Sequence, residues 1–129
     1  MKTTHPTRVL IVDDDELILM ALRQKLEKEG MQVYTSSNIY DAYFKVNQSA
    51  PDLILLDIVL PDMNGLSFMN MINSNVLNTR IPVILMSSLS TDDIIEKSYE
   101  MGASGYITKP FDMNAITGII RQHTQRAMH

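Results

Sequence analysis

Acidic side chains directly follow two short apolar runs, and their type and spacing suit a magnesium site. Asp13 and Asp14 come after Val9–Val12, and Asp57 comes after Leu53–Leu56. If both runs are neighbouring strands that end at one edge of a sheet, the three carboxylates lie close together and repel one another. A hard divalent cation relieves that repulsion, and carboxylate and carbonyl oxygens are ligands that Mg²⁺ prefers.

A hydroxyl and an ammonium group stand at equivalent places later in the chain. Ser87 follows Pro82–Met86, and Lys109 follows Gly105–Thr108. A cation, a lysine, a hydroxyl and a carboxylate converging on one point can stabilise a phosphoryl group during transfer. Each residue alone has an ordinary explanation, such as a helix cap for the acidic run or a solvated loop charge for Lys109. Their joint occurrence favours phosphoryl chemistry.

The elements that position these residues follow from the hydrophobic pattern. Strands are expected at 9–12, 33–35, 53–56, 82–86 and 105–108. Amphipathic helices are expected at 15–29, from 39 until Pro51, at about 66–73, from Thr91 to near Gly102, and after Asp112. Asp15 is the expected cap of the first helix, and Gly30 its stop signal. Strands that alternate with helices, without hairpin signals, predict an α/β fold whose parallel sheet is covered on both faces.

Composition narrows the possible functions. A chain of 129 residues corresponds to about one domain, and its 45% hydrophobic and 20% charged residues are too apolar for disorder. The net charge of -4 argues against a nucleic-acid-coating module. The lack of cysteine excludes a disulfide scaffold, a thiolate zinc site and a cysteine nucleophile. No apolar run is long enough for a membrane span, and none follows the charge of Lys2, so we expect a cytoplasmic protein without a signal peptide.

Four segments resemble the receiver domains of two-component response regulators, in particular the stand-alone chemotaxis regulators. The segments are Val9–Asp14, Leu55–Gly65, Pro82–Ser87 and Gly105–Phe111. The resemblance extends from about Arg8 to Arg121. It implies a flavodoxin-like, doubly wound (βα)5 fold with strand order 2-1-3-4-5. It also implies a single receiver domain over residues 1–129, with a core of about 8–125.

The resemblance further implies a phosphorylation-dependent signalling switch rather than a turnover enzyme. Asp57 would accept a phosphoryl group from a sensor histidine kinase or a histidine phosphotransfer protein. Asp13, Asp14 and Asp57 would hold Mg²⁺ together with the backbone carbonyl of Val59. The phosphorylated domain would control a separate effector protein or an output domain, with no direct nucleic-acid or membrane contact of its own. Dimerisation on phosphorylation is left open.

The resemblance assigns the remaining site residues to phosphoryl binding and switching. Ser87 and Lys109 would bind the phosphoryl oxygens, and Tyr106 is the switch aromatic that responds to Ser87. Lys109–Pro110 is a candidate cis peptide bond. Val59 and Leu89 are apolar where fast-cycling relatives often carry polar groups, and neither can orient a water molecule. This predicts slow self-dephosphorylation.

Other functional classes fit the sequence less well. Asp13 and Asp15 resemble the nucleophile and acid of a haloacid-dehalogenase-like phosphohydrolase. That family usually has Thr or Val at the position of Leu17, and its mechanism would leave Asp57 without a role. A calcium loop fails because Leu17 and Ile18 occupy ligand and glycine positions. An interaction module without phosphorylation is disfavoured by the complete set of site residues.

Overall fold

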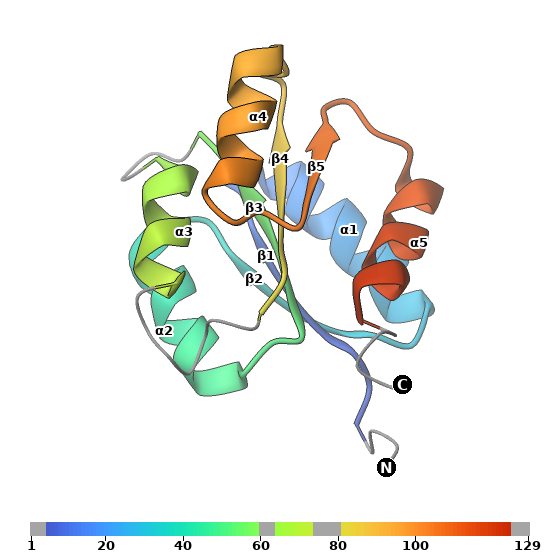
Figure 1. Ribbon diagram of the computed structural model, residues 1–129. Coiled ribbons are helices and arrows are strands. Elements are labelled where there is room, and N and C mark those ends of the chain that lie inside the picture. The colour runs from blue at the N-terminus through green and yellow to red at the C-terminus, as the bar shows by residue number, and fades with distance from the viewer. Residues whose placement is uncertain (1–4, 60–63, 74–80, 125–129) are drawn as a thin grey trace.

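Five parallel strands form one sheet in the order β2-β1-β3-β4-β5, which confirms the predicted α/β fold and strand order (Figure 1). The structure is a computed structural model that describes residues 5–59, 64–73 and 81–124. The strands are β1 Arg8–Val12, β2 Gln32–Ser36, β3 Leu53–Asp57, β4 Val83–Ser87 and β5 Gly105–Thr108. Asp57 and Ser87 are thus the last residues of their strands rather than the first residues after them.

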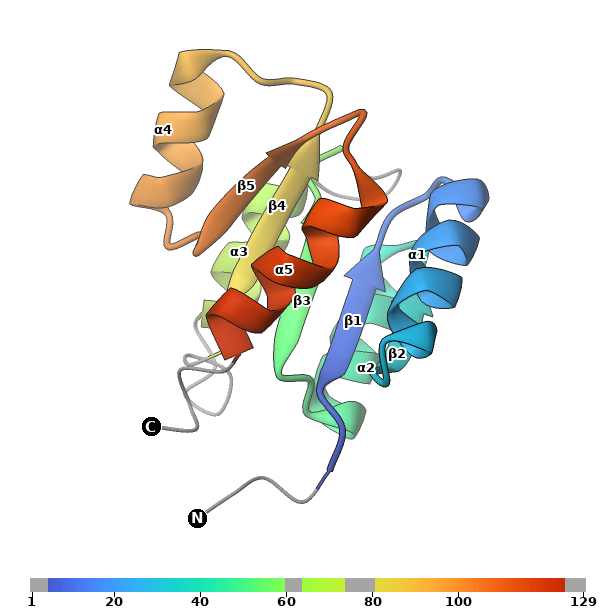
Figure 2. The same cartoon turned by 90° about the vertical axis from the view of Figure 1, so that its right-hand side faces the viewer.

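Helices cover both faces of the sheet, as the alternating pattern predicted. They are α1 Glu16–Lys28, α2 Ile39–Ser49, α3 Gly65–Asn73, α4 Asp92–Glu100 and α5 Met113–Thr124. Figures 1 and 2 show α2, α3 and α4 on one face and α1 and α5 on the other. This doubly wound arrangement brings the carboxyl ends of the strands to a single edge.

The central strands of the sheet are buried on both sides, which explains why β3 and β4 each contain four consecutive apolar residues. All five residues of β3 and all five of β4 are buried. One core cluster packs Leu10, Ile54 and Leu85 against α2 and α3, and another packs Ile11 and Leu55 against α1 and α5. A strand covered on both faces needs apolar side chains at every position rather than at alternate ones.

The helix ends largely follow the expected signals. The Asp15 carboxylate accepts hydrogen bonds from the main-chain N–H groups of Leu17 and Ile18, which confirms its role as the cap of α1. Gly30 lies just past this helix with a φ of 87°, a conformation that glycine adopts without strain. On the inner face of α1, Leu19 is buried and Ile18 only partly so.

Later helices are capped in the same way. Thr91 caps α4 as predicted, and the Asp112 carboxylate accepts the N–H of Asn114 at the start of α5. Asn38 caps α2, and this helix ends at Ala50, whose φ of 48° lies in the left-handed region. Within the described ranges, none of the helices combines the length and the hydropathy that crossing a bilayer requires.

Candidate functional site

Three aspartates meet at the carboxyl edge of the sheet. Val12 pairs with Leu56 across β1 and β3, so the next residues, Asp13 and Asp57, face each other from adjacent strands. With Asp14 they offer carboxylate oxygens that all lie within 4.8 Å of one another. Asp13 and Asp57 are buried, whereas Asp14 is exposed. The sequence prediction that the three carboxylates converge is confirmed.

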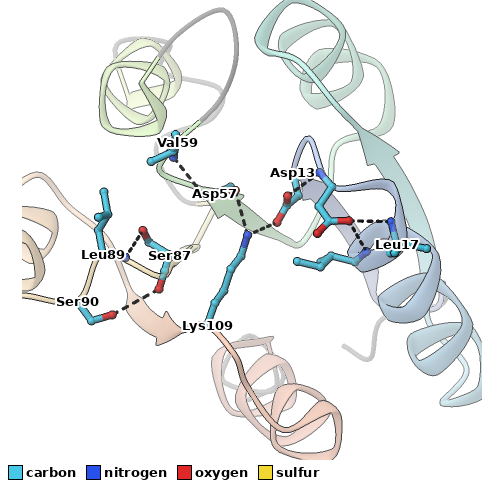
Figure 3. Close-up of polar contacts among 10 residues, drawn as sticks. Asp13, Leu17, Asp57, Val59, Ser87, Leu89, Ser90 and Lys109 are labelled. Atoms are coloured by element: carbon cyan, nitrogen blue, oxygen red, sulfur yellow. Dashed lines mark hydrogen bonds and ion pairs between the residues drawn. The ribbon is translucent and has the colours of Figure 1, made fainter.

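Lys109 points from the end of β5 into this acidic cluster (Figure 3). Its Nζ lies 2.7 Å from Asp13 Oδ2 and 3.0 Å from Asp57 Oδ2. The other oxygen of each carboxylate accepts a main-chain hydrogen bond, from Asp15 N to Asp13 Oδ1 at 2.9 Å and from Val59 N to Asp57 Oδ1 at 3.1 Å. Both buried carboxylates are therefore fixed in orientation by partners on each side.

The electrostatics of the cluster leave a deficit of positive charge. Burial raises the pKa of Asp57 and the charge of Asp13 adds to that effect, so hydrogen bonds from Lys109 and Val59 do not bring it back to its usual value. Burial alone would lower the pKa of Lys109, but hydrogen bonds to Asp13 and Asp57 outweigh burial and raise it. Three carboxylates outnumber one ammonium by two charges, which is the charge of one divalent cation. The donor set fits Mg²⁺, a cation that prefers oxygen ligands.

Ser87 lies beside the cluster and is linked to β5 through the main chain of Leu89. Ser87 Oγ accepts the Leu89 N–H at 2.9 Å, and the Tyr106 hydroxyl donates to the Leu89 carbonyl. A second link joins Ser90 Oγ to Thr108 Oγ1 at 2.9 Å. The segment between β4 and α4 is thus held by Ser87 at one end and by β5 side chains along its length.

Gly65 is a positioning residue to which the sequence analysis gave no role. A Cβ atom at this position would lie 2.8 Å from Ile58 Cα and 3.1 Å from the Asp57 carbonyl carbon. Its N–H donates to the Ile58 carbonyl at 2.6 Å. Only glycine allows the start of α3 to approach the end of β3 this closely. The glycine was visible in the sequence, but the contact depends on how the chain returns after Val59.

The sequence model of the response regulator receiver domain family matches residues 9–121. The chain belongs to this family. Receiver domains are phosphoacceptor switches of two-component systems rather than turnover enzymes, and they interact with histidine kinases or phosphotransfer proteins. The predicted family and its broad function are confirmed.

Relatives of the receiver domain include proteins of very different length. Sporulation initiation phosphotransferase F of Bacillus subtilis is 34% identical over 116 residues, which cover 90% of this chain and 92% of that protein. The transcriptional regulatory protein KdpE of Staphylococcus aureus is 35% identical over 89% of this chain but only 48% of its own length. A CheY-like receiver domain protein from Methanospirillum hungatei has a TM-score of 0.87 at 29% identity, covering 94% of this chain and 95% of that one.

Most predicted site residues of the receiver domain come together at the carboxyl edge. Asp13, Asp14, Asp57 and Lys109 form the cluster, and the predicted cis bond before Pro110 is present. The Tyr106 hydroxyl donates to the carbonyl of Leu89, and the N–H of Leu89 donates to Ser87 Oγ, so Leu89 links Tyr106 to Ser87. Residues 60–63 of the matching segment, residues 74–80 and the two ends of the predicted domain (1–4 and 125–129) lie outside the described residues.

Proposed function

We propose that Asp57 is the phosphoacceptor of this receiver domain, with Mg²⁺ held by Asp13, Asp14, Asp57 and the carbonyl of Val59. The observation that carries this proposal is the Lys109 ammonium bound to two buried carboxylates that are still short of positive charge. A phosphoryl group brings further negative oxygens to the same place. Such a group is stable there only beside fixed positive charges.

The transfer forms one bond and breaks another. A carboxylate oxygen of Asp57 attacks the phosphorus of a phosphohistidine in the partner protein, and the P–N bond breaks. The electron pair of that bond leaves with the imidazole nitrogen, which solvent can protonate. The ammonium of Lys109 would pair with the oxygens of the transferred phosphoryl group, because it already lies 3.0 Å from Asp57. When bound, the cation supplies the remaining positive charge for the phosphoryl oxygens.

Ser87 would bind a phosphoryl oxygen through its hydroxyl and so connect the phosphoryl group to Tyr106. In the described state, Ser87 Oγ accepts the N–H of Leu89, whose carbonyl accepts the Tyr106 hydroxyl. A Ser87 that turns toward Asp57 gives up the Leu89 hydrogen bond, and the main chain that holds Tyr106 is then free to shift. We propose the surface of α4, β5 and α5 as the output surface that this shift would change.

The phosphorylated state would be lost slowly by self-dephosphorylation. In that step a water oxygen attacks the phosphorus, the bond to Asp57 breaks, and inorganic phosphate leaves with the carboxylate restored. The side chains of Val59 and Leu89 are 55% and 46% exposed and purely apolar. They can neither donate to nor accept from an attacking water, so they give it no preferred orientation.

An acyl phosphate of low molecular mass, supplied with Mg²⁺, tests the phosphoacceptor directly. We expect intact-protein mass spectrometry to show one added phosphoryl group on the parent and none on Asp57→Asn. Asp15→Asn is the matched control, because asparagine caps a helix as well as aspartate does. Uptake that persists in Asp57→Asn would refute the proposal.

The same control variant, Asp15→Asn, distinguishes the proposed phosphoacceptor from a phosphohydrolase. A haloacid-dehalogenase-like enzyme would need Asp15 as its acid, so Asp15→Asn would abolish turnover of a phosphomonoester. The Asp15 carboxylate instead caps α1 through Leu17 and Ile18 and makes no hydrogen bond to the buried cluster that the structure records. We therefore expect no turnover by the parent and unchanged phosphoryl uptake by Asp15→Asn.

We propose only the type of each partner. One is a histidine kinase or a phosphotransfer protein, and the other is the effector that the domain controls. The chain covers 92% of sporulation initiation phosphotransferase F but 48% of KdpE, and the proposed effector is either a separate protein or an output domain. Whether the domain dimerises on phosphorylation stays open.

A further inference from the structure

The strand β2 forms one edge of the sheet, and the main-chain groups of two of its residues point away from the rest of the sheet. Gln32 N donates to Thr7 O, and Ser36 O accepts from Asp13 N, so even-numbered residues of β2 bond to β1. Main-chain groups alternate in direction along a strand, so Val33 and Thr35 direct their N–H and C=O groups outward. Such an edge is a template for another strand.

Two cations from opposite faces of the sheet occupy the outward carbonyls. Arg23 Nη2 of α1 donates to Val33 O at 3.0 Å, and Lys45 Nζ of α2 donates to Thr35 O. The two helices flank the edge strand from the two sides, as Figures 1 and 2 show. Both outward acceptors of the edge are therefore already bonded.

Each cation is held in place by an acid one turn away on its own helix. Arg23 Nε lies 3.6 Å from Glu27 Oε2, and Lys45 Nζ lies 3.0 Å from Asp41 Oδ2. Burial alone would raise the pKa of Asp41, but hydrogen bonds from Lys45 and Ser36 outweigh it and hold the pKa below its usual value. The Asp41 carboxylate is therefore charged at neutral pH and keeps Lys45 beside the strand.

We propose that Arg23 and Lys45 close the open edge of the sheet against pairing with β2 of a second copy of this chain. A strand can pair with β2 only by donating its own N–H groups to Val33 O and Thr35 O, and each cation competes for one of these acceptors. Charged side chains at an edge are a common protection against such pairing.

A second copy is the occupant that the geometry fits. In an antiparallel pair centred on Tyr34, Val33 of one copy lies opposite Thr35 of the other, and both have outward N–H and C=O groups to exchange. The sequence of β2, Gln-Val-Tyr-Thr-Ser, contains β-branched and aromatic residues and has neither a charge nor a proline. The strand has no charged residue or proline that would hinder pairing with another strand. Arg23 of α1 and Lys45 of α2 therefore provide the hindrance.

The double variant Arg23→Met, Lys45→Met tests the proposal on the unphosphorylated full chain. Methionine keeps a long stem and a good helix propensity but removes the donor. We expect at least tenfold tighter self-association than the parent by sedimentation velocity, together with slower amide exchange at Val33 and Thr35 as concentration rises. The control Lys28→Met, Lys97→Met makes the same change in net charge at two exposed helix positions and should match the parent.

Three outcomes would overturn the proposal. They are an unchanged association constant, association equal to that of the control pair, and association that leaves exchange at Val33 and Thr35 unaffected. If circular dichroism shows that the double variant does not fold, Lys45→Met alone is measured in the same way. Concentration-dependent protection of the Thr35 amide then supports the proposal, and concentration-independent exchange overturns it.

Discussion

Lys109 lies between two buried carboxylates, and the charged forms of the lysine and of Asp57 are not equally stabilised. Lys109 gains from both Asp13 and Asp57, so its charged form is stabilised. Asp57 shares that one ammonium with Asp13, and burial disfavours its charged form more than Lys109 stabilises it. The charged form of the side chain that we propose as the nucleophile is therefore disfavoured when no divalent cation is bound.

This imbalance predicts that Asp57→Asn stabilises the metal-free protein. The folded-state pKa of Asp57 is raised, so its ionised form destabilises the fold above that pKa, and the penalty is relieved as pH falls through it toward the unfolded value. In a chelating buffer at about pH 8, we expect the variant to unfold at a higher temperature than the parent. The difference should shrink as the buffer is acidified toward about pH 4. Asp93→Asn, an exposed position in the first turn of α4, is the control and should show no such gain.

Addition of Mg²⁺ should reverse the order of the two proteins. A ligand that binds only the folded state stabilises it by mass action, to the extent of about 2.7 kcal/mol at one hundred times its Kd. The parent has the complete carboxylate set and should rise in melting temperature, whereas Asp57→Asn should respond much less. A variant that is less stable than the parent in chelator, or equally stabilised by Mg²⁺, would contradict this account of the cluster.

We expect the lifetime of the proposed phosphorylated state to depend on groups that can orient water. We expect Val59→Asn to shorten it by about tenfold, because the amide can hold the attacking water, and a tenfold change corresponds to ~1.4 kcal/mol in the barrier. The decay of the phosphorylated species is followed by mass spectrometry after the donor is removed. Val59→Ala is the control, since it opens space without adding a polar group. A lifetime shortened equally in both variants would mean that bulk, rather than water orientation, limits the reaction.

At the scale of the elements, the two helices beside the edge strand end differently. The chain turns after α1 at Gly30 with a φ of 87°, and α2 ends at Ala50 with a φ of 48°. The left-handed conformation suits glycine but crowds the Cβ atom of any L-residue. The end of α2 is therefore strained where the end of α1 is not.

Exchanging the two residue types should change stability in opposite directions. We expect Ala50→Gly to raise the free energy of unfolding by roughly 1 kcal/mol and Gly30→Ala to lower it by about as much. A Cβ at Gly30 would meet no atom within 4 Å, so the loss there would come from backbone conformation alone. Urea unfolding with a common m-value measures both changes. A stabilising Gly30→Ala would show that the positive φ imposes no strain.

Elements buried on both faces were the most readable from the sequence. The strands β3 and β4 each begin with four apolar residues because these residues are covered on both faces, and a buried acid or hydroxyl is the last residue of each strand. Asp15 and Thr91 predict the starts of their helices because a side-chain cap is a local interaction. The edge strand β2 was less clear, and it proved one residue longer at each end than expected.

Contacts between distant segments could not be read in the same way. The hydrogen bonds of Arg23 and Lys45 to β2 depend on how two helices pack beside one strand. The close approach of Gly65 to the end of β3 depends on how the start of α3 packs against that strand. Family resemblance pointed to Tyr106, but only the fold shows that its hydroxyl donates a hydrogen bond to the main-chain carbonyl of Leu89.

At the scale of the whole molecule, the short segment between β4 and α4 connects the site with the proposed output surface. The residues between β4 and α4 are bonded to Ser87 at one end and to Tyr106 and Thr108 of β5 along their length. A phosphoryl group can shift the balance between two conformations only as far as it binds one of them better. We propose that this preference acts through Ser87, because its Oγ accepts the N–H of Leu89 in the segment and its carbonyl accepts the N–H of Lys109.

We therefore expect Ser87→Ala to separate phosphoryl binding from the response of Tyr106. Beryllofluoride with Mg²⁺ mimics the phosphoryl group, and in the parent it should change the NMR chemical shifts of both Asp57 and Tyr106. In Ser87→Ala the carboxylates and Lys109 remain, so the Asp57 shift change should persist while that of Tyr106 is largely lost. Ser88→Ala, an exposed neighbour on the same segment, is the matched control and should behave as the parent. A full Tyr106 response in Ser87→Ala would mean that the signal reaches β5 by another path, such as Lys109, which follows β5 directly.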